Sequence, residues 1–420
     1  MMTGKMKNKC ILCGAGLSES LFHADNMPAG AQAMPSAADI AAGRDTGISL
    51  ELKRCPCCGL TQFDCEPVDY YKKVIRAVGL SATMQELRRQ DYRHLIETYG
   101  MGNKKWIECG CGNGDFLKVL TEFPVDIYGT EASAENVDAA RRSLCGRPSA
   151  ESENQVSSVT LPVPENHIMQ FFPDEADMEI PGAPFDVFLS FNFLEHQPDP
   201  VSMLRCIHKN LAAGGIGLIT VPSFEYIIKN GRYYELVRDH IANYDLPALL
   251  YLCGYCGFEV LEQGYIGIGD TLRVVVRKAD GKQGISASQT DGPANYRILE
   301  ENYEFMSGQI AEYMDRLRAE GRSIAMWGAS HQGFTIAATT ALKDHVQYII
   351  DSAPFKQGLY APASHLPIVP PSWYEDHPVD VIMIAAPGYI REIEKTIREK
   401  YAGTIAGVPK ICDVLSMRER

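Results

Sequence analysis

The sequence has few of the features that mark membrane, secreted or nucleic-acid-binding proteins. Its 420 residues contain no run of about 18 to 20 uncharged apolar residues, the length that a membrane-spanning helix needs. No apolar stretch follows the basic start MMTGKMKNKC, so we expect no secretory signal. Asp and Glu (53) outnumber Lys and Arg (40), and no basic stripe is present to bind nucleic acid. We therefore expect a cytoplasmic protein that acts on a small molecule and binds neither membrane nor nucleic acid.

The cysteines indicate a metal site rather than a disulfide framework. There are 13 of them, an odd number, in a chain without an export signal. Two Cys-x-x-Cys pairs, Cys10/Cys13 and Cys55/Cys58, predict a structural zinc ion, because four thiolates complete a tetrahedral shell. Cys57 is an alternative to Cys58 as a ligand, and four unrelated free cysteines are the alternative to zinc. The Ala-, Gly-, Ser- and Pro-rich stretch between the pairs, around 26–46, is expected to be a flexible insertion.

The chain is too long for one ordinary core, and its pattern divides into three segments. We predict a zinc-binding domain over 1–75, where little apolar sequence is available for a core. Strand-like and helix-like runs alternate over 76–280, which predicts a mostly parallel sheet with helices on both faces. A polar stretch then leads into 296–420, where a long helix pattern and further strands predict a second, smaller α/β unit.

A glycine-rich turn follows the strand predicted at 106–109 and opens a helix. Its E-x-G-x-G-x-G pattern differs from the dinucleotide fingerprint and lacks the Lys-Ser/Thr of a P-loop. An acid at the front of the turn suits a cationic, amino acid-like ligand better than a pyrophosphate. A second acid, Glu131, ends the next strand, where a carboxylate can accept hydrogen bonds from ribose hydroxyls. The turn consists of Glu108, Gly110, Gly112 and Gly114.

The turn, the second acid and the later strand at 185–190 resemble the class I S-adenosylmethionine methyltransferases. The resemblance implies that Glu108 and the three glycines line the methionine and ribose part of S-adenosylmethionine and that Glu131 holds the ribose. It further implies that Phe171 and Phe172 flank the adenine and that Asn192 lies beneath the sulfonium. A different Rossmann-type nucleotide site remains the alternative.

Taken as a whole, the three-part chain resembles the sugar C-methyltransferases of deoxysugar biosynthesis. The markers in the third segment are the block Trp327–Gly333 and the stretch 351–360. The resemblance implies an α/β protein with a central class I (Rossmann-like) methyltransferase domain. A small N-terminal zinc-binding domain and a C-terminal Rossmann-like domain flank it, and the latter binds the nucleotide end of a nucleoside-diphosphate 4-keto sugar. Lys356 is expected to contact the diphosphate.

The resemblance also implies the catalytic residues, with one departure from the family pattern. The family's Tyr-x-Glu-His segment becomes Val237-Arg-Asp239-His240 here, so the tyrosine is missing and the acid is Asp239. His240 is expected to remove the proton beside the ketone, because its ordinary pKa suits neutral pH. His196 is expected to orient its neighbours or to stabilise the enolate oxygen.

Several tyrosines are candidates for the missing phenol and for contacts with the acceptor. We expect Tyr233, Tyr234 or Tyr244 to replace the phenol, with Tyr244 catalytic and Tyr234 in contact with the substrate. Tyr70 and Tyr71 match a tyrosine-bearing region before the methyltransferase domain. Two alternatives stay open: a methyltransferase with another acceptor (a non-sugar carbon, oxygen or nitrogen), and a non-catalytic scaffold that binds S-adenosylmethionine. The sequence does not indicate the oligomeric state.

Overall fold

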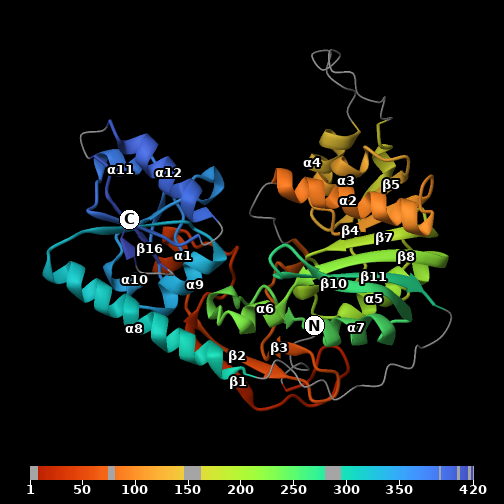
Figure 1. The fold of residues 1–420 in the computed structure, drawn as a ribbon, viewed down its shortest axis with the longest axis horizontal. Coiled ribbons are helices and arrows are strands. Elements are labelled where there is room, and N and C mark those ends of the chain that lie inside the picture. Colours follow the sequence, from red (N-terminus) through yellow and green to blue (C-terminus); the bar gives the residue numbers. More distant parts are fainter. Residues whose placement is uncertain are drawn as a thin grey trace.

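The computed structural model describes residues 8–73, 81–145, 162–279, 295–386, 389–403, 407–414 and 418–419. Its strands form three sheets of four, seven and six strands. Figure 1 shows two lobes side by side, with the N-terminal strands below them and the long helix α8 running along the C-terminal lobe. No helix within the described ranges is long and apolar enough to span a bilayer.

A seven-stranded sheet forms the centre of the middle segment, in the order β10-β11-β8-β7-β4-β5-β6. The strands from β8 to β6 are parallel, and β11 runs antiparallel to both of its neighbours. The predicted mostly parallel sheet is therefore confirmed. The strands are β4 (Lys105–Cys109), β5 (Asp126–Glu131), β6 (Ile168–Gln170), β7 (Phe185–Phe191), β8 (Leu211–Pro222), β10 (Phe258–Ile266) and β11 (Thr271–Lys278).

Helices cover both faces of this sheet, as parallel crossovers require. Figure 1 shows α2, α3 and α4 on one face and α5 and α7 on the other. Asp199 caps α5 by accepting a hydrogen bond from the N–H of Ser202, and Asp245 caps α7 in the same way from Ala248. The helices are α2 (Ala82–Tyr99), α3 (Asp115–Leu120), α4 (Ala134–Leu144), α5 (Pro200–Asn210), α6 (Phe224–Lys229) and α7 (Leu246–Tyr255).

The N-terminal sheet takes one of its strands from the middle segment. Strands β1 (Ser20–Met27), β2 (Ile48–Arg54) and β3 (Thr61–Phe63) are antiparallel, and β3 pairs with β9 (Ala242–Asn243). Arg54 strengthens this junction, because it forms an ion pair with Asp245 at 2.9 Å. The two segments separated at residue 75 in the sequence analysis therefore share a sheet next to His240.

The expectation of a flexible insertion around 26–46 is wrong. This stretch contains the end of β1 and helix α1 (Ala37–Ala41), which starts with a reciprocal capping box. It also reaches the C-terminal lobe, where the Asp45 carboxylate accepts hydrogen bonds from His365 Nε2 and from the N–H of Ala363, both at 2.8 Å. Small residues suggested a linker, but partners some 320 positions away hold the stretch in place.

The C-terminal lobe is a second α/β unit with the strand order β14-β13-β12-β15-β16-β17. Its strands are parallel except β17. The strands are β12 (Ile324–Trp327), β13 (Ile349–Ile350), β14 (Ile368–Val369), β15 (Val381–Ile384), β16 (Lys410–Asp413) and β17 (Arg418–Glu419). The helices are α8 (Arg297–Ala319), α9 (His331–Thr339), α10 (Leu342–His345), α11 (Trp373–Asp376) and α12 (Ile390–Tyr401).

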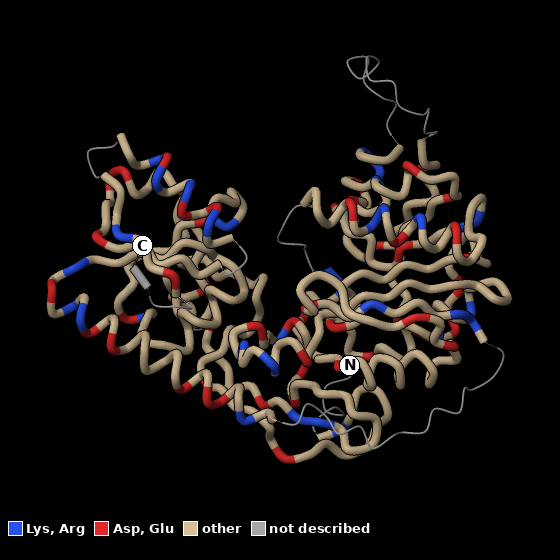
Figure 2. The backbone as a smooth tube through the Cα atoms, in the orientation of Figure 1, with Lys and Arg blue, Asp and Glu red and all other residues tan. Residues whose placement is uncertain are grey.

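Charged residues of both signs are mixed over the two lobes. Figure 2 shows Lys and Arg interspersed with Asp and Glu along the backbone, and no continuous basic stripe is visible over the described residues.

Candidate active site

The glycine-rich turn between β4 and α3 has the backbone conformation that its sequence predicts. Gly110, Gly112 and Gly114 all have positive φ, at 77°, 56° and 83°. A Cβ at Gly110 would lie 2.7 Å from the ring of Phe193, so only glycine fits there. A Cβ at Gly112 would meet nothing within 4 Å, which leaves the space in front of the turn open to a ligand.

Glu131 connects this turn to the start of α4 through hydrogen bonds. Its two carboxylate oxygens accept hydrogen bonds from the N–H of Gly112 at 3.0 Å and the N–H of Ser133 at 2.9 Å. Each oxygen retains a further lone pair, so the same carboxylate can accept two ribose hydroxyls. Glu108 is buried at the end of β4, below the turn. The open turn and the acid beside it fit the adenosyl part of S-adenosylmethionine.

An aromatic cluster lies beside the turn. The ring of Phe172 makes edge contacts with Tyr71 at 6.0 Å and with Phe193 at 5.8 Å between centroids. The N–H of Phe171 donates to the carbonyl of Glu131 at 3.0 Å, which places this pair of phenylalanines next to the predicted ribose acid. The structure thus brings Tyr71, Phe171 and Phe172 together near the turn. The sequence analysis did not select Phe193, whose ring lies so close to Gly110 that a Cβ there would clash with it.

Asn192 directly follows β7 and has a left-handed conformation, with φ at 48°. Its side-chain oxygen accepts a hydrogen bond from the Thr220 hydroxyl at 3.0 Å, which fixes the amide. Asn192 borders a cavity of about 440 Å³ that Phe116, Phe191 and Arg88 also line. Tyr389 of the C-terminal lobe lines the same cavity, so both lobes contribute to its wall.

Two histidines meet close to the end of β7. The rings of His196 and His240 lie edge to face with their centroids 4.7 Å apart. His196 follows β7 in a short 3-10 helix, Leu194–His196, and His240 precedes β9. Glu195 completes the group, and its Oε1 lies 3.9 Å from His196 Nε2. One imidazole nitrogen of each histidine and one carboxylate oxygen of Glu195 all lie within 4.8 Å of one another. The sequence analysis did not select Glu195.

Burial sets the charge of this group. Burial lowers the pKa of His240 well below its usual range, and the neighbouring His196 and His331 add to the effect. Burial also lowers the pKa of His196. In contrast, burial raises the pKa of the Glu195 carboxyl to about 8. All three groups are therefore neutral near pH 7, and both histidines have an unprotonated nitrogen.

The side chains of Asp239 and Tyr70 form hydrogen bonds with each other and with backbone N–H groups. The Tyr70 hydroxyl donates to Asp239 Oδ1 at 2.6 Å, and the N–H of Ala31 donates to Oδ2 at 2.7 Å. The Tyr70 hydroxyl also accepts from the N–H of Gln32 at 3.1 Å. Both carboxylate oxygens of Asp239 therefore hold the chain around His240 in place. These contacts suit a positioning role for Asp239 and Tyr70, and the expected catalytic role of Asp239 and substrate contact of Tyr70 stay predictions.

Tyr244 and Tyr234 lie in the core rather than on an open face. Tyr244 is fully buried, and its hydroxyl has no hydrogen-bond partner among the described residues. Burial raises the pKa of Tyr244, and the nearby Glu195 adds to this shift. Tyr234 packs edge to face on Tyr233 at 5.8 Å and is also buried. The expected roles of Tyr244 in catalysis and of Tyr234 in contact with the substrate stay predictions.

Lys356 is held inside the C-terminal lobe and is only 9% exposed. Its ammonium donates to the carbonyl of Ala329 at 2.8 Å and pairs with Asp351 Oδ2 at 3.3 Å. The same Asp351 oxygen accepts from the N–H of Ala329 at 2.9 Å. Lys356 therefore braces the glycine turn after β12, and the expected contact with a diphosphate does not fit these contacts.

The four predicted zinc ligands converge in the N-terminal unit. The sulfur atoms of Cys10 and Cys58 are 3.4 Å apart, as are those of Cys13 and Cys55, and all four lie within 4.8 Å of one another. A tetrahedral zinc site with Zn–S bonds of about 2.3 Å separates its sulfurs by about 3.8 Å. The cluster therefore fits a zinc ion, and it includes Cys58 rather than the exposed Cys57.

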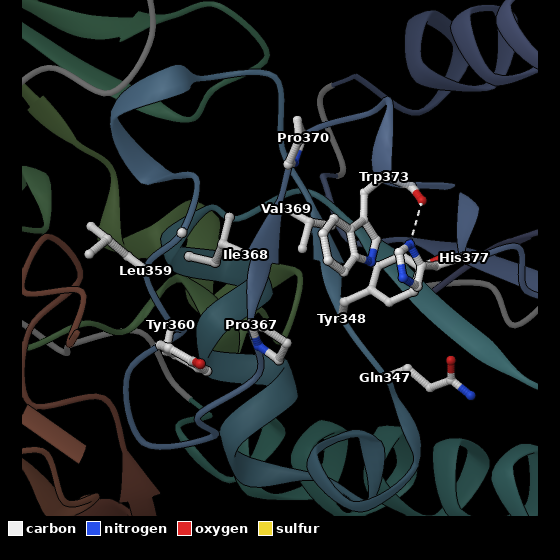
Figure 3. A pocket seen from close by; sticks show the side chains of 11 residues that line it. Gln347, Tyr348, Leu359, Tyr360, Pro367, Ile368, Val369, Pro370, Trp373 and His377 are labelled. Carbon is white, nitrogen blue, oxygen red and sulfur yellow. Dashed lines mark hydrogen bonds between the residues drawn. The ribbon is translucent and has the colours of Figure 1, made fainter. Parts of the chain in front are cut away.

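A second cavity, of about 540 Å³, lies in the C-terminal lobe (Figure 3). Tyr348, Tyr360 and Trp373 line it together with His377, whose ring stacks on Trp373 at 4.0 Å. Sequence patterns did not predict this cavity, because its wall comes from separate short segments between 347 and 377.

The strand order and the turn define the class of protein. A parallel core with an antiparallel β11 between β8 and the edge strand β10, a glycine turn after β4 and an acid at the end of β5 is the class I methyltransferase fold. In agreement, residues 84–263 match the family model described as a methyltransferase domain, and residues 286–409 match the C-methyltransferase C-terminal domain.

Individual relatives agree with these matches. C-methyltransferase NovU of Streptomyces niveus is 25% identical over 232 residues, which cover 51% of this chain and 55% of NovU. Ubiquinone biosynthesis O-methyltransferase of Psychrobacter arcticus is 29% identical over 121 residues, covering 29% of this chain and 42% of that enzyme. The chain thus spans about half the length of the curated relatives it matches.

A solved structure, magnesium protoporphyrin IX methyltransferase (ChlM) of Synechocystis PCC 6803, is also similar. It is 12% identical with a TM-score of 0.34, and the match covers 50% of this chain and 90% of that one. The chain belongs to the C-methyltransferases that join a methyltransferase domain to a C-methyltransferase C-terminal domain. The resemblance to the sugar C-methyltransferase family is therefore confirmed at the level of the family.

Proposed function

We propose that this protein transfers the methyl group of S-adenosylmethionine to a carbon atom next to a ketone. The acceptor that we favour is a nucleoside-diphosphate 4-keto sugar. The observation that carries the proposal is the neutral histidine pair, His196 and His240, placed close to the strand end that borders the donor turn. Removal of a proton from carbon needs a base with an unprotonated nitrogen, and a neutral histidine supplies one.

The donor site consists of the turn and the acid after β5. S-adenosylmethionine, when bound, supplies an electrophilic methyl group on a sulfonium. Gly112 leaves the space for it, and Glu131 accepts its ribose hydroxyls while remaining bonded to the turn. Asn192, fixed by Thr220, borders the cavity where the sulfonium would face the acceptor.

We favour a sugar acceptor because of the domain organisation. The C-methyltransferase C-terminal domain faces the methyltransferase domain across the 440 Å³ cavity, where Tyr389 joins Asn192 in the wall. A second lobe at this place suits an acceptor that extends beyond the reacting ring, as a nucleotide sugar does. NovU, the C-methyltransferase of Streptomyces niveus, shares about half of its length with this chain.

In the reaction, His240 takes the proton from the carbon beside the ketone, and the electron pair of that bond becomes the enolate. The enolate carbon is then the nucleophile, and S-adenosylmethionine, held by the glycine turn and Glu131, would supply the methyl group and keep the electron pair of the broken bond on a neutral thioether sulfur. Neutral His196 does not stabilise the enolate by donating a hydrogen bond. The Asp239 carbonyl lies 2.8 Å from Nδ1 and can only accept a hydrogen bond, so Nδ1 carries the single N–H of the ring and donates it there. Positioning of the two reactants supplies much of the rate.

The test is methyl transfer with a labelled donor in deuterated water, using a panel of 4-keto nucleotide sugars. The expected result is label on carbon and exchange of the proton beside the ketone without donor. His240→Asn should abolish both while donor affinity, measured by calorimetry, stays within about twofold. His345→Asn, on a separate helix of the C-terminal lobe, is the matched control and should behave as the wild type.

Other outcomes separate the alternatives. Label on oxygen or nitrogen without proton exchange would replace the carbon acceptor by another one. Donor binding without transfer to any acceptor would favour the scaffold, and absence of donor binding would contradict every reading based on S-adenosylmethionine.

A further inference from the structure

The contacts of His196 define its tautomer. Nδ1 lies 2.8 Å from the backbone carbonyl of Asp239, and a carbonyl oxygen accepts hydrogen bonds but cannot donate one. Nδ1 therefore carries the proton of the neutral ring, and Nε2 carries a lone pair. His196 is only 8% exposed, so this lone pair faces protein rather than water.

The carbonyl that fixes His196 is itself fixed. Asp239 is held by Tyr70 Oη at 2.6 Å and by the N–H of Ala31 at 2.7 Å, and it is buried. The residue that orients His196 thus immediately precedes His240 and cannot rotate freely. In this way the ring of His196 and the backbone of His240 form one rigid unit.

The His240 ring has no side-chain hydrogen bond to any other described residue, although it lies beside an acceptor. A nitrogen of His240 and a nitrogen of His196 are within 4.8 Å, and the rings meet edge to face at 76°. A neutral imidazole in solution exchanges between two tautomers, and only one of them presents a lone pair to a given carbon acid. Hydrogen bonds of this kind are often long in the free enzyme and shorten when the acceptor binds.

We propose that His196 is the positioning residue for the base, an assignment that rests on the proposed function. Its Nε2 accepts the N–H of His240, and this leaves the other nitrogen of His240 unprotonated toward the acceptor carbon. The chain runs from the Asp239 carbonyl through His196 to His240. It follows the logic of a catalytic triad, in which a third group holds the base in the correct tautomer.

The first experiment reads the tautomer directly and needs no acceptor. Full-length protein labelled with ¹⁵N in histidine gives long-range proton–nitrogen NMR spectra that distinguish the two nitrogens of each ring. Spectra are recorded with the donor product bound. In the wild type, His196 should be protonated at Nδ1 and His240 should be a single tautomer. In His196→Met, His240 should become a mixture of tautomers, and an unchanged His240 would overturn the proposal.

The second experiment uses turnover with three variants at matched positions. His196→Met, which can neither donate nor accept in this way, should lower kcat by about 10²-fold with little change in KM. His196→Gln offers an N–H to the Asp239 carbonyl and an oxygen to the His240 N–H, so it should recover at least tenfold of that loss. His94→Met, whose ring bonds Glu262 on the outer side of the sheet, is the control and should retain wild-type kcat.

The outcomes separate this proposal from the proposed function. If the wild type exchanges no carbon-bound proton in any 4-keto sugar, the proposed function fails, while the NMR result still decides the role of His196. If the wild type is active and His196→Met matches it, or His196→Gln is as impaired as His196→Met, the positioning role is contradicted. A loss that appears in KM alone, with kcat preserved, would also contradict it.

Discussion

Replacing Glu195 by glutamine should change how stability depends on pH. Glu195 is only 2% exposed, and its Oε2 has no hydrogen-bond partner among the described residues. Burial raises its pKa from about 4.5 to about 8. The native state therefore keeps a proton that the unfolded chain loses, so the wild type becomes less stable as pH rises from about 4.5 to about 8.

The magnitude follows from the shift. A change of about 3.5 pKa units corresponds to at most about 5 kcal/mol, at 1.36 kcal/mol per unit. Glutamine has the shape of a protonated glutamate and does not titrate, so Glu195→Gln removes this term. Relative to the wild type, the variant should gain several kcal/mol of unfolding free energy between pH 5 and pH 8.5, with little difference at pH 5.

Urea unfolding of both proteins at intervals from pH 5 to pH 9 measures this difference. The control is Asp39→Asn. Hydrogen bonds from the hydroxyl and the N–H of Ser36 and from Arg44 lower the pKa of Asp39 to about 2. Asp39 is ionised in both states throughout this range, and Ser36 and Arg44 do not titrate there, so its variant should differ from the wild type by a constant amount. A similarly constant difference for Glu195→Gln would refute a buried, protonated Glu195.

Three further predictions concern the other parts of the chain. Cys13→Ser should reduce bound zinc from about one per chain to near zero in metal analysis and lower the melting temperature. If metal analysis found almost no zinc in the wild-type protein itself, the zinc site would be excluded. Glu131→Gln should weaken binding of the donor by about 10- to 100-fold in calorimetry, because it removes a charged acceptor; unchanged affinity would remove Glu131 from the donor site. Asp45→Ala should raise the KM for the acceptor and leave donor affinity intact, because it frees His365 and Ala363 from the N-terminal stretch; equal KM values would show that this contact does not position the lobe.

Local signals predicted the methyltransferase core well. The strands expected at 106–109 and 185–190 lie within β4 and β7, because an apolar run indicates a buried strand from the residues of that run alone. The same holds for the turn after β4, where each glycine has the positive φ that its pattern requires. The cysteine pairs were also found from spacing alone.

Contacts between distant residues could not be predicted in this way. The 26–46 stretch has the composition of a linker, yet it pairs with the C-terminal lobe through Asp45. Lys356 was expected to contact a diphosphate, but its ammonium donates to the carbonyl of Ala329, which follows a different strand, β12. The sequence analysis did not select Glu195, because its burial and the lack of a hydrogen-bond partner for Oε2 among the described residues become visible only in the fold.

The loop around His240 is where all three parts of the chain depend on one another. Asp239 bonds to Ala31 of the N-terminal stretch, and the following β9 pairs with β3 beside the zinc cluster. The N-terminal stretch in turn bonds to the C-terminal lobe through Asp45. A change in the position of the C-terminal lobe is therefore transmitted to the base through covalent backbone and short hydrogen bonds, not through a flexible linker. It follows that a fragment limited to the methyltransferase domain should still bind the donor but should lack an ordered His240.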